Sequence, residues 1–177
     1  FRAAGAAGAA GKFLSRDFKT IGWQKPLIAE LASRLRVPLL LSDIDVVFQR
    51  PAFGSIARLS WERRAVAFMA SASTGGNVGL VWLNAHHAST VGYARAWAAE
   101  TVANETWDQD AFVEAIKHQP RRTVNNLDPE LFVLCCHRHV SWTELCVERA
   151  RRAPRYVAMH MVCEKDKAEG LKNLTLW

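Results

Sequence analysis

Residues 39–48 read Leu-Leu-Leu-Ser-Asp-Ile-Asp-Val-Val-Phe, an apolar run that is interrupted by two carboxylates. The run does not alternate between apolar and polar residues, as expected for a strand that is covered on both faces. We therefore expect a central strand of a parallel sheet here. Asp43 and Asp45 stand at i and i+2, so they share a face of the strand where it ends. Two carboxylates placed in this way can hold a divalent cation that binds phosphate oxygens.

The sequence on either side of this stretch predicts helices that alternate with strands. Before it, residues 25–36 predict an amphipathic helix, because apolar side chains recur there at helical spacing: Leu27, Ile28, Leu31 and Leu35. After it, the patterns predict strands at 65–70, 78–83 and 156–161, helices at 88–102 and 107–118, and a short terminal helix. Strands that alternate with helices predict an α/β sandwich with a mostly parallel central sheet.

The length of 177 residues predicts one domain over residues 1–177, which we expect to be incomplete. Residues 1–11 are rich in Ala and Gly and have little side-chain volume to bury, so we expect a flexible N-terminal tract. The sequence has no run of about 18 uncharged apolar residues that could span a bilayer. We expect membrane contact only through a segment that is missing from this chain.

The net charge of +6 favours anionic partners, among them phosphate-bearing small molecules. We expect no nucleic-acid partner, because the basic residues are dispersed and no aromatic side chains interleave with them as a stacking platform requires. The exception to this dispersal is one cluster, which is typical of a solvated helix end: Arg149, Arg151, Arg152 and Arg155.

A cluster of soft ligands makes a structural zinc site one alternative to consider. Its members are Cys135, Cys136, His137, His139 and Cys146. Adjacent cysteines point in different directions, which disfavours zinc and leaves buried thiols or disulfides formed in the secretory lumen. The sequons at Asn104 and Asn173 are also compatible with a protein of the secretory pathway.

Further motifs follow the two carboxylates in order along the chain. They are Asn77-Val78-Gly79-Leu80-Val81, Trp107-Asp108-Gln109-Asp110-Ala111-Phe112, Leu127-Asp128, and His160 followed by Lys165, Lys167 and Trp177. From about residue 18 to residue 177, this ordered set resembles the nucleotide-diphospho-sugar transferases. Residues 40–51 are similar to the DxD segment of these transferases, and the likeness is closest to glycosyltransferase family 77.

The resemblance implies a Rossmann-like GT-A fold and a retaining, metal-dependent glycosyltransferase. The donor would be a nucleotide sugar, expected to be a UDP-sugar, and the acceptor a glycan or glycoprotein. The cofactor would be Mn²⁺ or Mg²⁺, and a mixed oxygen and nitrogen shell suits Mn²⁺. The implied location is the Golgi lumen, as the catalytic part of a type II membrane protein.

The resemblance also assigns roles to individual residues. Asp43, Asp45 and His160 would hold the metal, with Asp45 as the most direct ligand. Asp43, Asp45, Asn77 and Gly79 would bind the donor, and Lys165 and Lys167 would contact its phosphates. Asp108 and Gln109 would be the catalytic residues near the anomeric carbon. The residues alone also allow structural roles: a core histidine at 160, a turn cap at Asn77, and helix capping at Asp108 and Gln109.

The sequence departs from the family pattern in two places. Forty-two residues precede Asp43, so we expect the N-terminal nucleotide-binding strand and helix of the fold to be truncated. The family also often has an asparagine shortly after its histidine, and residues 161–163 read Met-Val-Cys. Contacts with donor or acceptor can therefore differ there.

Two other functions remain as alternatives. Residues 43–47 also fit the DxDx[TV] motif of haloacid-dehalogenase-like phosphatases, in which Asp43 would be the nucleophile and Asp45 the general acid and base. The other alternative is a non-catalytic remnant of a transferase that still binds sugar or nucleotide.

Overall fold

The structure is a computed structural model that describes residues 16–61, 64–69, 76–120, 123–134 and 156–160. Its elements follow in the order α1 (Arg16–Gly22), α2 (Gln24–Arg34), β1 (Leu39–Ser42), β2 (Val46–Phe48), α3 (Ala52–Trp61), β3 (Val66–Met69), β4 (Asn77–Leu83), α4 (Ala88–Ala103), α5 (Asp108–Lys117), β5 (Val124–Leu127), β6 (Phe132–Leu134) and β7 (Ala158–His160). The chain is therefore an α/β protein, as predicted. None of the helices in the described ranges has the length and apolar character that crossing a membrane requires.

The larger sheet has four strands in the order β1-β4-β3-β5, and it is mixed. β4 is antiparallel to both β1 and β3, and β3 is parallel to β5. The prediction of a mostly parallel sheet was wrong in this respect. The reason is the short stretch of residues 70–76 between β3 and β4, since parallel neighbours need a crossover of a dozen residues or more.

Strand β1 lies at the end of this strand order, so the prediction of a central parallel strand there was also wrong. Within the described residues it pairs antiparallel with β4 alone, from Leu39 opposite Leu83 to Ser42 opposite Leu80. Leu39, Leu40 and Leu41 are half-buried rather than fully covered. An unbroken apolar run predicts burial, but it does not report how many neighbouring strands supply that burial.

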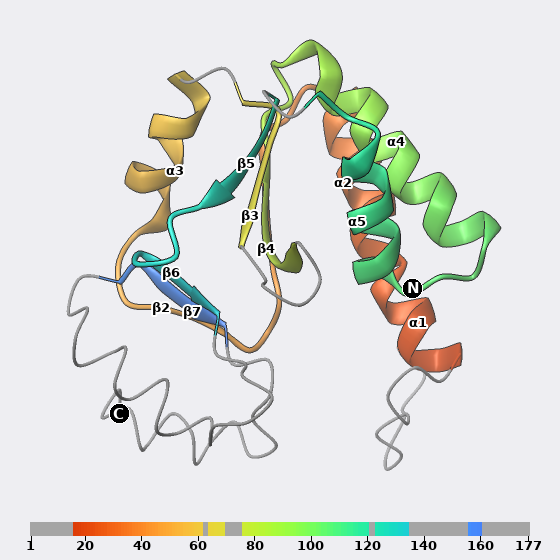
Figure 1. The fold of residues 1–177 in the computed structure, drawn as a ribbon, viewed down its shortest axis with the longest axis horizontal. Coiled ribbons are helices and arrows are strands. Elements are labelled where there is room, and N and C mark those ends of the chain that lie inside the picture. Colours follow the sequence, from red (N-terminus) through yellow and green to blue (C-terminus); the bar gives the residue numbers. More distant parts are fainter. Residues whose placement is uncertain (1–15, 62–63, 70–75, 121–122, 135–155, 161–177) are drawn as a thin grey trace.

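The four-stranded sheet is covered on both faces (Figure 1). Alternate residues of β3 and β4 face opposite sides, as the pleat requires. Val66, Phe68, Val81 and Leu83 join the core formed with α2, α4 and α5, whereas Ala67, Met69, Leu80 and Trp82 join the core that contains Ile56 of α3. Phe112 of α5 lies edge-on to Phe68, Tyr93 and Trp97, with ring centroids 5.0, 5.7 and 5.0 Å away. The sheet is therefore packed between two hydrophobic cores.

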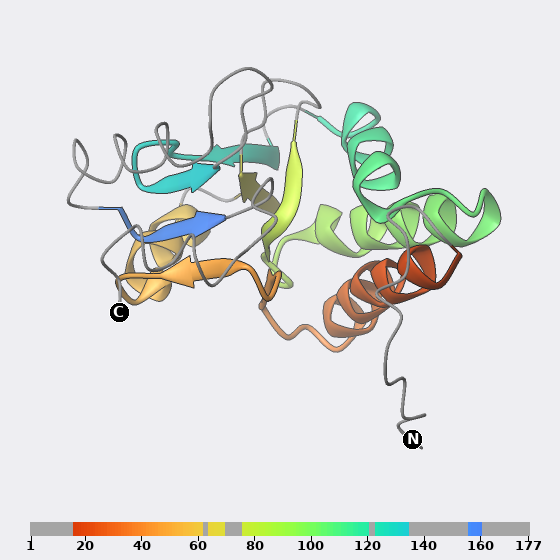
Figure 2. The same ribbon diagram turned by 90° about the horizontal axis from the view of Figure 1, so that it is seen from below.

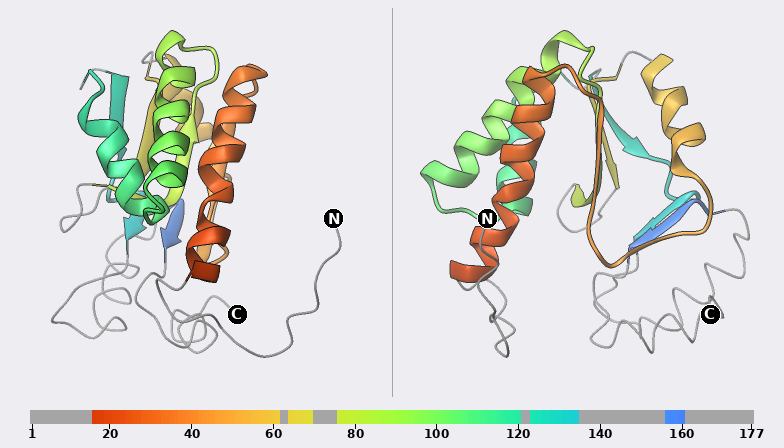
Figure 3. Two further views of the ribbon diagram at one scale, coloured as in Figure 1. Left: turned by 90° about the vertical axis from the view of Figure 1, so that its right-hand side faces the viewer. Right: turned by 180° about the vertical axis from the view of Figure 1, so that it is seen from behind.

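Helix α2 exists as predicted, but its buried face differs from the predicted one. It buries Pro26, Ala29 and Ser33, and Ala29 shares a core with Ala94 of α4. Small residues let the two helices approach closely. The apolar side chains at helical spacing face outward instead, with exposures of 47–65% for Leu27, Ile28, Leu31 and Leu35. The packing of α2 beside α4 is visible in Figure 3.

The smaller sheet has three strands in the order β2-β7-β6, with β7 antiparallel to β2 and parallel to β6. Figure 2 shows it beside the larger sheet. The Leu127-Asp128 turn joins β5 to β6. In this turn Asp128 Oδ1 accepts a hydrogen bond from the Glu130 N–H, and the Asp128 carbonyl accepts from the N–H groups of Leu131 and Phe132. The chain passes from one sheet to the other at residues 43–45, where β1 ends and β2 begins.

Candidate metal and donor site

Asp43, Ile44 and Asp45 form a turn between the two sheets. The N–H of Asp43 donates to the carbonyl of Gly79 on β4 at 2.8 Å, and the N–H of Val46 donates to the carbonyl of Asp43 at 3.2 Å. Ile44 projects fully into solvent. The carboxylates of Asp43 and Asp45 point inward instead, and their side chains retain 27% and 20% exposure. The turn therefore offers two carboxylates that remain accessible to a ligand.

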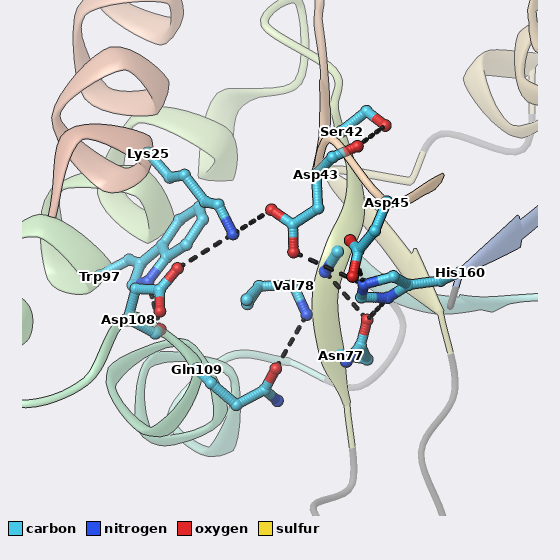
Figure 4. A network of polar contacts seen from close by, with 11 residues as sticks. Lys25, Ser42, Asp43, Asp45, Asn77, Val78, Trp97, Asp108, Gln109 and His160 are labelled. Carbon is cyan, nitrogen blue, oxygen red and sulfur yellow. Dashed lines mark hydrogen bonds and ion pairs between the residues drawn. The ribbon is translucent and has the colours of Figure 1, made fainter. Parts of the chain in front are cut away.

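His160, at the end of β7, faces this pair of carboxylates from the neighbouring sheet (Figure 4). Its imidazole Nε2 lies 3.1 Å from Asp45 Oδ1 and 3.6 Å from Asp43 Oδ2, and its side chain is 4% exposed. One ligand atom from each of the three residues lies within 4.8 Å of the other two. The three predicted metal ligands are thus brought together from both sheets.

Asn77 holds a proton on Nδ1 of His160. Its Oδ1 accepts a hydrogen bond from the Gly79 N–H at 2.9 Å and lies 2.8 Å from His160 Nδ1. An amide oxygen cannot donate, so Nδ1 must carry the proton in this contact. In the neutral imidazole, Nε2 then has a free lone pair, and this nitrogen is the one that faces the carboxylates.

Gly79 makes room for the imidazole ring. A Cβ built at this position would overlap the imidazole ring of His160. The motif Asn-x-Gly therefore has a physical explanation: Asn77 sets which nitrogen of His160 is protonated, and Gly79 lets the ring lie directly against β4. The structure places both residues at the site through contacts within the protein, and their contact with a donor stays a prediction.

Lys25, on α2, is a site residue that the sequence analysis missed. Its Nζ lies 2.5 Å from Asp43 Oδ1 and 3.2 Å from Asp108 Oδ2. Burial disfavours the charge of Lys25, but the carboxylates of Asp108 and Asp43 more than offset this, and the pKa of Lys25 is raised. The stability from these ion pairs is therefore fully present at neutral pH, and it is lost as the pH rises through that raised pKa. No local sequence pattern marks this lysine, because its partners lie on other elements.

Asp108 and Gln109 open α5, and both are buried, at 2% and 3% exposure. The Asp108 carbonyl accepts a hydrogen bond from Trp97 Nε1 at 2.9 Å. Gln109 Oε1 accepts from the Val78 N–H at 3.1 Å, and Gln109 Nε2 donates to the Gly76 carbonyl. Gln109 therefore holds the start of β4, next to Asn77. The third polar residue of this helix turn, Asp110, is exposed to solvent.

Replacing Gln109 with alanine is expected to destabilise the protein by about 2 kcal/mol, because it removes the two buried hydrogen bonds to the Val78 N–H and the Gly76 carbonyl. For a chain of this length, the melting temperature should fall by roughly 4 to 8 °C. Thermal unfolding measures this effect. Gln119→Ala, just beyond the end of α5, is the matched control and should change the melting temperature little. Equal stability of Gln109→Ala and the wild type would contradict the positioning role.

Several predicted residues lie outside the described residues. These are Lys165 and Lys167, the cluster of Cys135, Cys136, His137, His139 and Cys146, the arginines at 149–155, Asn173, the tract at 1–11 and the terminal helix. Their proposed roles stay predictions. The site as described consists of Asp43, Asp45 and His160 as potential ligands, with Asn77, Gly79 and Lys25 around them and Asp108 and Gln109 beside them.

Comparisons with known proteins identify a family and a fold for this chain. A family model described as nucleotide-diphospho-sugar transferase matches residues 3–174. Among solved structures, the chain is similar to a glycosyltransferase involved in the glycosylation of the major capsid of PBCV-1, with a TM-score of 0.60 and 16% identity. The superposition covers 93% of this chain and 80% of that chain. A search of curated proteins finds no match. At this identity, the structural likeness establishes a GT-A-like fold.

Proposed function

Because the chain belongs to the nucleotide-diphospho-sugar transferase family, we propose that it transfers a sugar from a UDP-sugar to a glycan or glycoprotein with the help of Mn²⁺ or Mg²⁺. The observation that carries this proposal is the convergence of Asp43, Asp45 and His160 Nε2 at the junction of the two sheets. The family membership favours the transferase over the phosphatase alternative.

The donor set fits a divalent cation of this kind. Two carboxylate oxygens and a neutral imidazole nitrogen are acceptor atoms that repel one another unless a cation or a proton lies between them. Oxygen and nitrogen ligands together suit Mn²⁺, and oxygen ligands suit Mg²⁺. When bound, such an ion neutralises the charge of the departing diphosphate as a Lewis acid.

The chain's own residues would each perform a distinct task. Asp43 and Asp45 would hold the ion that carries the diphosphate, and His160 would complete the shell through Nε2. Lys165 and Lys167 are proposed to contact the phosphates. Asp108 and Gln109 are proposed for the region of the anomeric carbon, where Gln109 holds the backbone of residues 76–78 in place. We also propose that the transfer retains the anomeric configuration of the sugar. The proposed location is the Golgi lumen, on a type II membrane protein.

UDP is expected to bind in the presence of Mn²⁺ and at least tenfold more weakly in EDTA, because the two carboxylates repel the diphosphate when no cation lies between them. Isothermal titration calorimetry with UDP, GDP and ADP, each with and without Mn²⁺, measures this difference. Equal affinity for UDP in EDTA and in Mn²⁺ would contradict the metal site.

Turnover is tested separately from binding. Incubation with UDP-sugars, Mn²⁺ and glycan or glycoprotein acceptors should release UDP as the sugar passes to an acceptor hydroxyl, and proton NMR of the glycosylated product should show the donor's anomeric configuration. Metal-dependent UDP binding without any release of UDP would favour the non-catalytic remnant. Hydrolysis of a simple phosphate monoester, with a trapped aspartyl phosphate on Asp43, would favour the phosphatase.

A further inference from the structure

Lys25 contacts the metal site from the side opposite to His160. On Asp43, Oδ1 is 2.5 Å from the Lys25 ammonium, whereas Oδ2 faces His160 Nε2 at 3.6 Å. One oxygen of the Asp43 carboxylate is therefore directed at the Lys25 ammonium, and the other is directed at the His160 imidazole (Figure 4). An ion held by Asp43, Asp45 and His160 would share Asp43 with a fixed positive charge.

This fixed charge is built into the fold. Lys25 is at the start of α2, its side chain is 25% exposed, and its second ion pair is with the Asp108 carboxylate, which is 3% exposed. Asp108 is held in turn by α5, whose first carbonyl binds Trp97 of α4. The α1–α2 junction is tied to the same region, because Trp23 Nε1 donates to the Thr106 carbonyl at 3.0 Å. The ammonium is thus positioned by three helices.

We propose that Lys25 makes this site selective for a metal-loaded nucleoside diphosphate over the bare metal ion. The inference rests on the proposed metal-dependent binding of a nucleotide-sugar donor. An ammonium beside Asp43 repels a bare divalent cation. It attracts the complex of that cation with UDP, because the negative charge of the diphosphate exceeds the positive charge of the metal ion and the complex is net negative. In a partly desolvated site such charge interactions are stronger than in water.

The proposal predicts that two affinities change in opposite directions when the ammonium is removed. In Lys25→Met, the affinity for bare Mn²⁺ should rise about tenfold, and the affinity for UDP at saturating Mn²⁺ should fall about tenfold. Electron paramagnetic resonance of free Mn²⁺ measures the first affinity, and calorimetry measures the second. Lys25→Arg keeps the charge and should behave as the wild type in both.

Asp108 provides an independent arm of the test. Asp108→Asn removes a negative charge from the same ion-pair group, so both affinities should move opposite to those of Lys25→Met. The double variant Lys25→Met/Asp108→Asn removes one charge of each sign, and both affinities should return toward the wild type. In both variants the buried Asp108 carboxylate is replaced by a neutral amide, so neither contains an unpaired buried charge at this position. They therefore test the proposal even if Lys25→Met does not fold.

The matched control is Lys117→Met, which removes a lysine charge from an exposed pair with Glu114 and should leave both affinities unchanged. Two outcomes would overturn the proposal: a parallel fall of both affinities in Lys25→Met that the double variant does not reverse, or unchanged affinities in Lys25→Met and Asp108→Asn. Absence of metal-dependent UDP binding in the wild type would instead refute the proposed function. The two failures are therefore distinguishable.

Discussion

Replacing Gly79 with alanine is expected to weaken Mn²⁺-dependent UDP binding about 100-fold, because the added methyl group occupies the position of the His160 ring. β4 is central to its sheet and the ring is buried, so the imidazole must leave the site. Overpacking of this kind also costs about 1 to 3 kcal/mol of stability. Calorimetry with UDP and Mn²⁺, together with thermal unfolding, measures both effects.

The chain offers two matched controls for this substitution. Gly54 in α3 and Gly92 in α4 have no neighbouring atom within 4 Å of a built Cβ. Gly54→Ala and Gly92→Ala should therefore leave UDP binding unchanged and raise stability by about 0.5 to 1 kcal/mol, as alanine favours helix interiors. If Gly79→Ala behaved like these controls, His160 would not lie against β4 as described.

Changing Asp45 to asparagine is expected to reduce Mn²⁺-dependent UDP affinity about 100-fold, since it removes the charge of a proposed metal ligand and keeps the shape of the side chain. The metal-free protein should be as stable as the wild type or slightly more stable, because neighbouring carboxylates repel one another. The asparagine amide can also donate to His160 Nε2, which lies 3.1 Å from Asp45 Oδ1. Thermal melts with and without Mn²⁺ and UDP measure the ligand response and the stability together.

Asp110→Asn is the control for this charge change, since Asp110 is exposed in the first turn of α5. It should alter neither UDP affinity nor the stabilisation by Mn²⁺ and UDP. An Asp45→Asn protein that melts several degrees lower, yet responds to ligand as the wild type does, would show that Asp45 is structural.

The elements that the sequence predicted correctly are ones marked by an apolar run or by apolar residues at helical spacing. The strands β3 and β4 and the helices α4 and α5 were predicted within a few residues of their observed bounds. By contrast, α1, α3, β5 and β6 were not predicted. Strand β5 reads Val-Asn-Asn-Leu, and asparagine disfavours strands, so its conformation comes from pairing with β3. Such tertiary stabilisation leaves no local signal.

The candidate site was predictable to the extent that its residues lie in ordered motifs. Asp43, Asp45, Asn77, Gly79 and His160 were identified together, and the structure places them together. Lys25 was missed because its two carboxylate partners are distant in the sequence, and no fixed spacing between such residues marks an ion pair. The outward face of α2 was mispredicted for a related reason: periodicity reports an apolar stripe, but neighbouring helices decide which side of the helix is buried.

The topology of the smaller sheet also has a consequence for the order of folding. Its central strand, β7, is the last strand along the described chain, and it pairs Val46 with His160 across most of the sequence. Neither β2 nor β6 has its partner in this sheet until β7 arrives, and contacts between such distant residues form slowly. The same event delivers the imidazole nitrogen to the two carboxylates. Completion of the smaller sheet and assembly of the candidate metal site are thus one step, so a partly folded chain in which β7 has not docked has the two carboxylates without His160.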